Sequence, residues 1–347
     1  MRQKITLIVA IFLISALVLS ACGGGQAELP APPQNADSSG SPSVPEPAEA
    51  NTSQDSAEEE PAPDEAAESS EQPASADEFA PLPAEPQPIQ ITSAGDRVLE
   101  GWYYPARVDN APVVVLMHWA KGNMGDWQVI APWLQNRLDE ITVPQPGSEA
   151  YYDISWFPPM PEEISFAVVA FNFGNFGNSP FGGDRESWVW DAIGALNFAS
   201  SLEGIDPHRI SAIGASIGAD GAVDSCYLFN DAGEMGTCIG ALSLSPGNYL
   251  TENFIYPEAA EYIELSGFPV WCLAAENDYE SPALCSVLVG EHAQGFIFAG
   301  GAHGMDLLTQ DQVFLEPALP EDVNPMMVIQ EFLEVAYRTP LNDFNIP

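Results

Sequence analysis

The segment around Ser216 constrains the fold of this chain more than any other. An apolar run rich in β-branched residues leads into Gly214-Ala215-Ser216-Ile217-Gly218, and a helical stretch of small residues follows. Glycines two residues before and after the serine let a strand turn sharply into a helix, because larger side chains there would collide with neighbouring elements. One such motif is weak evidence in a chain with 28 glycines. With strand, turn and helix in this order, however, it predicts a nucleophile elbow at Ser216.

A carboxylate and a histidine follow Ser216 along the chain, each after a strand-like run. Residues 268–275 lead into a polar loop that contains Asp278, and residues 295–299 lead into the glycine-flanked His303. The order serine, acid, histidine is the one that α/β-hydrolases require. We therefore expect His303 to remove the proton from Ser216, while Asp278 holds the imidazole in the correct tautomer and stabilises the imidazolium.

Other residues compete for two of these roles. Glu276 and Glu280 lie close enough in sequence to replace Asp278 as the acid. His118, His208 and His292 compete with His303, which is favoured by its glycine-flanked loop after the last strand. His208 lies in a polar turn, and His292 precedes the last strand, at the wrong end of a parallel sheet.

The transition state of such a reaction needs N–H donors for a negatively charged oxygen. The backbone N–H of Ile217 is one candidate, because it follows the nucleophile at a helix N-terminus, where the helix dipole favours negative charge. The second candidate is Trp119, in the loop after the strand-like residues 112–117.

Together these residues resemble the α/β-hydrolase superfamily, in particular the dienelactone hydrolase and esterase type, over about residues 90 to 347. The resemblance rests on the elbow, on Asp278 followed by Pro282, and on three motifs: His118-Trp119, Asn172-Phe173-Gly174-Asn175-Phe176-Gly177-Asn178-Ser179 and Gly301-Ala302-His303-Gly304. It implies an α/β-hydrolase fold and a serine hydrolase without a cofactor.

Two positions differ from the pattern of that family. Dienelactone hydrolases have a cysteine where this chain has Ser216, which favours a serine esterase over a lactonase of that narrow type. The usual His-Gly dipeptide is replaced by His118-Trp119. Trp119 still has a backbone N–H but lacks the conformational freedom of glycine.

Residues 1–22 have the pattern of an export signal. Arg2 and Lys4 precede an apolar stretch, and Leu19-Ser20-Ala21-Cys22 is followed by glycines. The segment resembles a bacterial lipoprotein signal, in which Cys22 becomes the acylated N-terminus of the mature protein. A plain secretory signal and a membrane-spanning anchor are the alternatives. The expected location is the extracellular face of the cell membrane, with the lipid as the only membrane contact.

Composition divides the rest of the chain into two parts. Residues 23–88 are almost entirely Gly, Ala, Pro, Ser, Glu, Asp and Gln, with no Lys or Arg. They bury too little apolar surface to offset the entropy lost on ordering, so we predict a disordered acidic tether. Residues 89–347 then form one domain, of a length typical of a single α/β fold.

Strand-like and helix-like segments alternate through this domain. Strands are expected at residues 97–104, 112–117, 166–171, 209–214, 239–245, 269–275 and 295–299, and helices at 127–137, 186–201, 216–228 and 326–337. Such alternation predicts an α/β fold with a mostly parallel, doubly wound sheet, helices on both faces and ligands at the carboxyl ends of the strands.

Two long segments interrupt this alternation. Residues 139–164 run from a helix end to a strand start, so we expect them on the face opposite the catalytic loops. Residues 246–268 follow the carboxyl end of a strand and either form a small cap with an apolar acyl pocket or simply pack their own loop. Their large apolar and aromatic residues include Tyr249, Phe254, Ile255, Tyr256 and Tyr262.

Four cysteines remain besides Cys22: Cys226, Cys238, Cys272 and Cys285. An even number in an exported domain predicts two disulfides. Of the three possible pairings, the sequence-local one is favoured, with Cys226–Cys238 and Cys272–Cys285. No Cys-x-x-Cys motif and no histidine cluster is present, so we expect no metal site.

Charge narrows the choice of partners. The chain has 50 acidic and 9 basic residues, a formal net charge of −41, and the tether holds only 15 of the carboxylates. The domain is therefore strongly acidic and should repel nucleic acid, anionic lipid and highly anionic substrates. A small neutral ester fits better, and the oligomeric state is left open.

These observations predict an extracellular, membrane-tethered serine hydrolase that cleaves carboxylic esters through an acyl-enzyme. A peptidase similar to the prolyl oligopeptidases is one alternative, although the chain has no room for the large extra domain of those enzymes. A non-catalytic surface binding module, in which Trp119 blocks the oxyanion hole, is the other.

Overall fold

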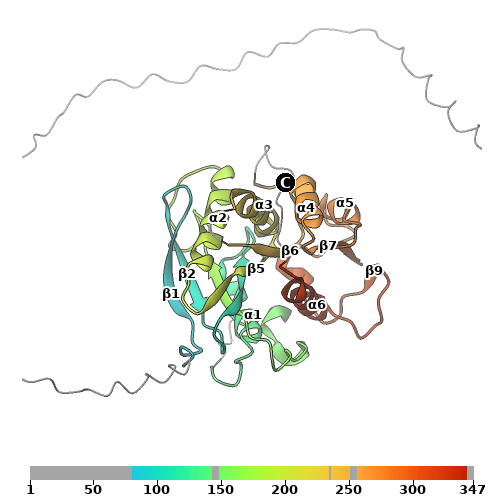
Figure 1. The fold of residues 1–347 in the computed structure, drawn as a ribbon. Coiled ribbons are helices and arrows are strands. Elements are labelled where there is room, and N and C mark those ends of the chain that lie inside the picture. Colours follow the sequence, from blue (N-terminus) through green and yellow to red (C-terminus); the bar gives the residue numbers. More distant parts are fainter. Residues whose placement is uncertain (1–79, 143–147, 234–235, 251–255, 342–347) are drawn as a thin grey trace, which may run out of the picture. The chain divides into compact units, whose positions relative to one another are not determined.

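A single continuous sheet of nine strands organises the computed structural model, which describes residues 80–142, 148–233, 236–250 and 256–341. The strand order across the sheet is β1-β2-β4-β3-β5-β6-β7-β8-β9. Figure 1 shows β1 and β2 at one side of the domain and β9 at the other. The strands are β1 (Gln87–Thr92), β2 (Val98–Tyr104), β3 (Ala111–Met117), β4 (Ala167–Phe171), β5 (Ile205–Ala215), β6 (Cys238–Leu244), β7 (Val270–Ala275), β8 (Ala293–Phe298) and β9 (Phe314–Glu316).

The strands from β4 across to β8 are mutually parallel. The pair β1 and β2 adds antiparallel strands at one edge, and β9 adds one at the other. This order and these directions are those of the α/β-hydrolase fold, so the predicted fold class is confirmed.

Helices cover both faces of the sheet (Figure 1). On one face α2 (Glu186–Ser200), α3 (Ile217–Ala232) and α4 (Tyr256–Leu265) share a core, and α5 (Ser281–Ser286) joins it through Cys285. On the other face α1 (Ile130–Leu134) and α6 (Pro325–Arg338) bury a second core. Because both faces are covered, β3, β4 and β7 are buried at every residue and their sequences are nearly continuous apolar runs.

The domain begins earlier than its composition suggests. The edge strand β1 starts at Gln87, inside the segment expected to be a tether. Ahead of it, the carbonyl of Leu82 accepts a hydrogen bond from Arg137 at 2.8 Å, and the carbonyl of Ala84 accepts one from Gln135 at 3.1 Å. Residues 82–88 therefore belong to the folded domain, although their Pro-rich sequence is like that of the preceding residues.

The helix expected at residues 127–137 is shorter and divided. A 3-10 turn covers Met124–Trp127, and α1 covers only Ile130–Leu134. Pro132 accounts for the late start of α1, because proline has no N–H to donate to the preceding turn and is tolerated only in the first turn of a helix. Asn136, with φ 56°, leaves the helical conformation and accounts for the early end.

Both disulfides join neighbouring elements. Cys226 of α3 is bonded to Cys238 of β6, and Cys272 of β7 is bonded to Cys285 of α5. These are the sequence-local pairings favoured above. The second bond fastens α5 to the strand that precedes it, and the loop between them carries Asp278.

The expected signal at residues 1–22, with Cys22, and most of the expected tether at 23–88 lie outside the described residues. Among the helices that the structure does describe, none is long and apolar enough to cross a membrane.

Removing either disulfide should lower the free energy of unfolding by about 3 kcal/mol, because each closes a loop of comparable length in the unfolded chain. The measurement is guanidinium unfolding of full-length Cys272→Ala/Cys285→Ala, with Cys226→Ala/Cys238→Ala as the matched pair. The first variant should also become more sensitive to proteolysis in the Asp278 loop. Equal protease resistance in both variants would contradict a bracing role for Cys272–Cys285.

Candidate active site

Ser216 occupies the sharp turn between β5 and α3. Its backbone angles are φ 52° and ψ −116°, a region that residues other than glycine rarely adopt. A Cβ at Gly214 would overlap the Gly218 carbonyl, and a Cβ at Gly218 would overlap the Met117 carbonyl of β3. Both positions therefore require glycine, because neither has room for a side chain. The Ser216 N–H donates to the Leu244 carbonyl of β6 at 2.8 Å, which ties the turn to the sheet.

Ser216, His303 and Asp278 form one hydrogen-bonded group. They meet because β5, β7 and β8 are parallel and end at the same edge of the sheet. His303 Nε2 lies 2.9 Å from Ser216 Oγ, and His303 Nδ1 lies 2.8 and 3.0 Å from the two carboxylate oxygens of Asp278. An ionised carboxylate only accepts hydrogen bonds, so Nδ1 carries the proton and Nε2 accepts from the serine hydroxyl. Asp278 is 3% exposed, whereas His303 stays partly open to solvent.

The competing acids and bases lie outside this group. Glu276 accepts a hydrogen bond from a backbone N–H of the loop after β8, and Glu280 is the N-cap residue of α5. His208 is exposed and contacts the Thr237 hydroxyl. His292 immediately precedes β8, at the opposite end of the sheet from His303.

His118 is buried between the loops that follow β3 and β4. Its Nδ1 donates to the Trp119 carbonyl at 2.7 Å, and its Nε2 accepts from the Phe173 N–H at 3.1 Å. Burial lowers the pKa of His118 to about 4, against a smaller upward effect of the bond to Trp119. The side chain is therefore neutral at neutral pH and links the two loops.

The two expected oxyanion donors have suitable backbone surroundings. Ile217 is the first residue of α3, so its N–H has no acceptor within the helix. In the part of the chain that the structure describes, no acceptor pairs with the Trp119 backbone N–H. The Trp119 side chain is 7% exposed, and its ring lies so close to Gly304 that a Cβ there would be 2.8 Å from it. Trp119 thus packs against the residue that follows His303.

Ser245 is a buried residue of this site that the sequence analysis missed. It follows β6 with φ 60°, and its Oγ accepts the N–H of Gly304 at 2.9 Å. The bond fixes the backbone directly after His303. No linear signal marks Ser245, because its partner lies 59 residues away in the sequence.

Asp220, also missed, holds the loop after β6 from the first turn of α3. Its carboxylate accepts from the Gly247 N–H at 3.0 Å and from the Tyr249 N–H. The Tyr249 ring lies edge-on to His303, with ring centroids 6.3 Å apart. Burial raises the pKa of Asp220 to about 7, and the charge of Glu280 adds to this effect, while the backbone hydrogen bonds oppose it.

The expected cap at residues 246–268 is described in part. Tyr249 faces His303, as a cap residue would. Tyr256 is buried in the core, and Tyr262 packs against Tyr227 of α3, so these two stabilise α4 rather than cover Ser216. The remaining residues named for the cap lie outside the described residues: Phe254 and Ile255.

The prediction that residues 139–164 lie opposite the catalytic loops is wrong. The 3-10 turn Ala150–Tyr152 contacts Gly304–Leu307, directly after His303. The Tyr152 hydroxyl also donates to Asp126 at 3.1 Å, in the loop region after β3. The prediction assumed that a connection stays near the two ends that it joins. This one is long enough to run back to the carboxyl edge of the sheet.

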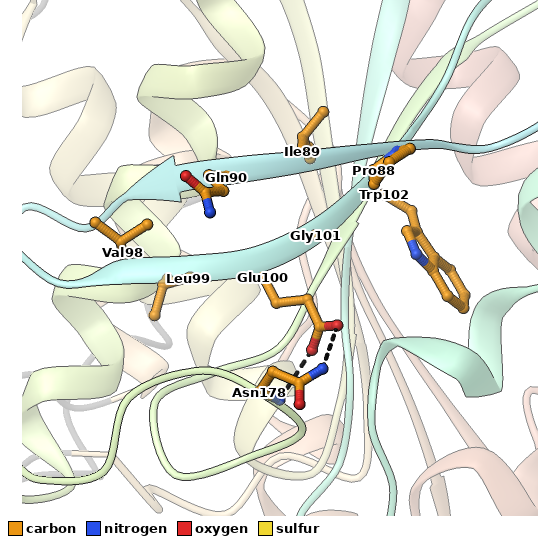
Figure 2. A pocket seen from close by; sticks show the side chains of 9 residues that line it. All are labelled: Pro88, Ile89, Gln90, Val98, Leu99, Glu100, Gly101, Trp102 and Asn178. Carbon is orange, nitrogen blue, oxygen red and sulfur yellow. Dashed lines mark hydrogen bonds between the residues drawn. The ribbon is translucent and has the colours of Figure 1, made fainter.

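A separate hollow of about 500 Å³ lies along β1 and β2 (Figure 2). Its acidic residue, Glu100, accepts from the Asn178 N–H, the Asn178 side chain and the Asn172 side chain at 2.8 to 2.9 Å. Burial raises the pKa of Glu100, but these hydrogen bonds outweigh it and hold the pKa below its usual value. Glu100 is therefore a structural acceptor for the loop after β4.

Within the described ranges, no group of three or more His, Cys, Asp or Glu side chains is placed to hold a metal ion.

Comparisons with known proteins find distant relatives. No protein-family model matches the chain. The uncharacterized protein YfhR of Escherichia coli K12 is 24% identical over 149 residues, which cover 42% of this chain and 43% of YfhR, less than half of either protein.

Solved structures are similar at still lower identity. The Pyrococcus furiosus esterase Pf2001 is 17% identical over 72% of this chain and 90% of its own, with a TM-score of 0.45. The Pyrobaculum calidifontis esterase is 16% identical over 73% and 84%, with a TM-score of 0.48. The carboxylesterase EstE1 from a metagenomic library is 18% identical over 65% and 83%, with a TM-score of 0.44. Likeness at this level assigns neither a substrate nor an activity.

The buried His118 should make stability depend on pH. The folded protein keeps His118 neutral down to about pH 4, whereas the unfolded chain binds a proton near pH 6.5. The unfolded state therefore gains protons first, and the free energy of unfolding falls by about 3 kcal/mol from this group as pH drops through that range. Asp220 has the opposite effect on the free energy of unfolding. Because its pKa is raised in the folded protein, the folded state binds a proton first, and the contribution of Asp220 to stability increases as the pH drops.

Comparison with His118→Asn isolates the histidine, because the contribution of Asp220 is shared by both proteins. We expect the difference in unfolding free energy between wild type and variant to narrow by about 3 kcal/mol between pH 7 and pH 4. Urea unfolding at several pH values gives this difference. A gap that stays constant with pH would show that His118 is already charged or is exposed.

Proposed function

We propose that this protein is a serine hydrolase that cleaves carboxylic esters through an acyl-enzyme. The observation that carries the proposal is the hydrogen-bonded chain from Ser216 Oγ through His303 to the buried Asp278, with Ser216 on a strained turn at a helix N-terminus. This combination of strain and connectivity is what an activated nucleophile requires.

The mechanism follows from the hydrogen bonds of His303. As Ser216 Oγ attacks the ester carbonyl carbon, Nε2 of His303 accepts the hydroxyl proton, and the carboxylate of Asp278 stabilises the imidazolium. The N–H groups of Ile217 and Trp119 stabilise the oxyanion. His303 then gives the proton to the leaving alcohol. A water molecule hydrolyses the acyl-enzyme by the same steps, with His303 again as the base.

The charge of the protein supports neutral substrates. Its formal net charge of −41 makes the approach of a highly anionic ester or of nucleic acid unfavourable, so a small neutral ester is the proposed substrate class. The partly open His303 is consistent with direct access of such a molecule to Ser216.

We also propose that the protein is exported and held at the outer face of the membrane by a lipid on Cys22. The sequence of residues 1–22 supports this proposal. The two disulfides of the described residues support it independently, because disulfides persist mainly in oxidising compartments. In this proposal the acidic residues from 23 up to Leu82, where the folded domain begins, separate the enzyme from the lipid surface.

A fluorophosphonate probe tests the nucleophile. Purified full-length protein should gain the mass of a single adduct, and Ser216→Ala should gain none. The variant should also hydrolyse p-nitrophenyl acetate at least about 10³-fold more slowly, because the attacking oxygen is gone. Absence of both adduct and hydrolysis in the wild type would favour a non-catalytic binding module.

Metabolic labelling tests the lipid anchor. In a bacterial host, the wild-type protein should incorporate labelled palmitate and sediment with membranes, whereas Cys22→Ser should do neither. Cys226→Ala/Cys238→Ala is the control for loss of cysteines as such and should still be labelled. An unlabelled, freely secreted wild-type protein would identify residues 1–22 as a plain secretory signal.

A further inference from the structure

Trp119 is held by its indole ring as well as by its backbone. The indole Nε1–H donates to Asp126 Oδ2 at 2.8 Å, and the bond is buried. The other side of the ring packs against Gly304. The ammonium group of Lys121 lies 5.1 Å from the ring centroid. The large side chain that replaces the usual glycine is therefore fixed in a single position.

Asp126 is the centre of this arrangement. Besides the indole, its carboxylate accepts the backbone N–H of Asn123 at 3.2 Å and the hydroxyl of Tyr152 at 3.1 Å. Asp126 is only 9% exposed, and in the described ranges it forms no ion pair. A buried carboxylate without a cation depends on hydrogen-bond donors, so the three donors and Asp126 stabilise one another.

The loop that carries Trp119 is wrapped tightly around the same carboxylate. The Gly122 N–H donates to the Trp119 carbonyl at 3.2 Å, which closes a turn. A Cβ at Gly122 would overlap Asp126 Oδ2 and would lie 2.5 Å from Trp119 Nε1. The position of the carboxylate therefore determines the path of the backbone from Trp119 to Gly122.

Tyr152 connects this carboxylate to the long segment between α1 and β4. Burial raises the pKa of the Tyr152 hydroxyl to about 12, and the charge of Asp126 and the hydrogen bond to it contribute further. The hydroxyl is therefore a hydrogen-bond donor across the physiological pH range. The same segment contacts Gly304–Leu307 after His303, so it touches both loops that flank Ser216.

We propose that Asp126 and Tyr152 are positioning residues for transition-state stabilisation, acting through the indole of Trp119. The inference rests on the proposed function. Glycine at the position of Trp119 would leave the loop to its own backbone preferences, whereas here a buried carboxylate fixes the loop through a side chain. Preorganised N–H donors account for a large part of catalysis at an oxyanion site, so a small displacement of this loop lowers the turnover rate.

A double-mutant cycle in the full-length protein tests the proposal. Asp126→Ala removes the acceptor of this bond and Trp119→Phe removes its donor, so each should lower kcat for p-nitrophenyl acetate about 10- to 100-fold with little change in KM. The double variant should be no slower than the slower single variant, because the bond is already absent. Tyr152→Phe leaves two donors on Asp126 and should have a smaller effect in the same direction.

Binding of a transition-state analogue separates a loss of loop positioning from a loss of folded protein. The inhibition constant of a trifluoromethyl ketone, whose adduct carries an oxyanion, should rise by the factor by which kcat/KM falls. Rates are divided by the concentration of active sites titrated with fluorophosphonate, so a smaller fraction of folded protein does not lower the measured kcat. Asp153→Asn is the control. It removes a neighbouring exposed carboxylate that accepts the N–H of Ser155, and it should leave kcat, KM and the inhibition constant unchanged.

The indole N–H signal of Trp119 in nitrogen-15 NMR reports the bond without reference to activity. Trp119→Phe identifies the signal by its loss, and Asp126→Ala, which has no acceptor for the indole, should shift it. An unshifted signal, or a shifted signal with unchanged kcat, would overturn the inference. If the Asp126 variant shifts the signal but the wild-type protein neither hydrolyses esters nor reacts with the fluorophosphonate, the proposed function is overturned instead, and with it the positioning role of Asp126 in catalysis.

Discussion

The steric constraint at the turn from β5 to α3 determines how the rest of the site is built. Gly214 lets α3 start directly against β5, and Gly218 lets it start directly against β3, so a single methyl group at either position would overlap a backbone carbonyl. This proximity forces Ser216 to a positive φ and directs the start of α3 to the carboxyl edge of the sheet. The loops after β3, β7 and β8 end at the same edge, so every other residue of the site is placed relative to that turn.

Buried polar side chains then convert flexible loops into fixed ones. His118 links the loops after β3 and β4, Ser245 holds the backbone after His303, and Asp220 holds the loop after β6. Each bond joins a loop to a strand end, a helix or another loop, and each is protected from water. A buried partner left without its hydrogen bond costs about 1 to 3 kcal/mol, so the bonds favour one arrangement of the loops over all others.

Local patterns were sufficient to predict the central strands, the position of Ser216, and the positions of Asp278 and His303 in loops after strands. Such features leave a trace in sequence because continuous apolar runs and paired glycines follow from burial and crowding. The edge strand β1 and the helices α4 and α5 were not predicted. Segments that are rich in proline, or whose sequence has only a weak helix or strand pattern, become ordered through tertiary contacts. The hydrogen bonds of Ser245, Asp126 and Tyr152 could not be predicted either, since each of these residues bonds to a partner distant in the sequence.

The hydrogen bonds ahead of β1 have a mechanical consequence. An edge strand paired with a single neighbour is easily peeled from its free end when the chain before it is pulled. Here Arg137 and Gln135, directly after α1, donate hydrogen bonds to the carbonyls of Leu82 and Ala84. A force applied to the chain at Leu82 therefore acts on the core beneath α1 before it acts on β1.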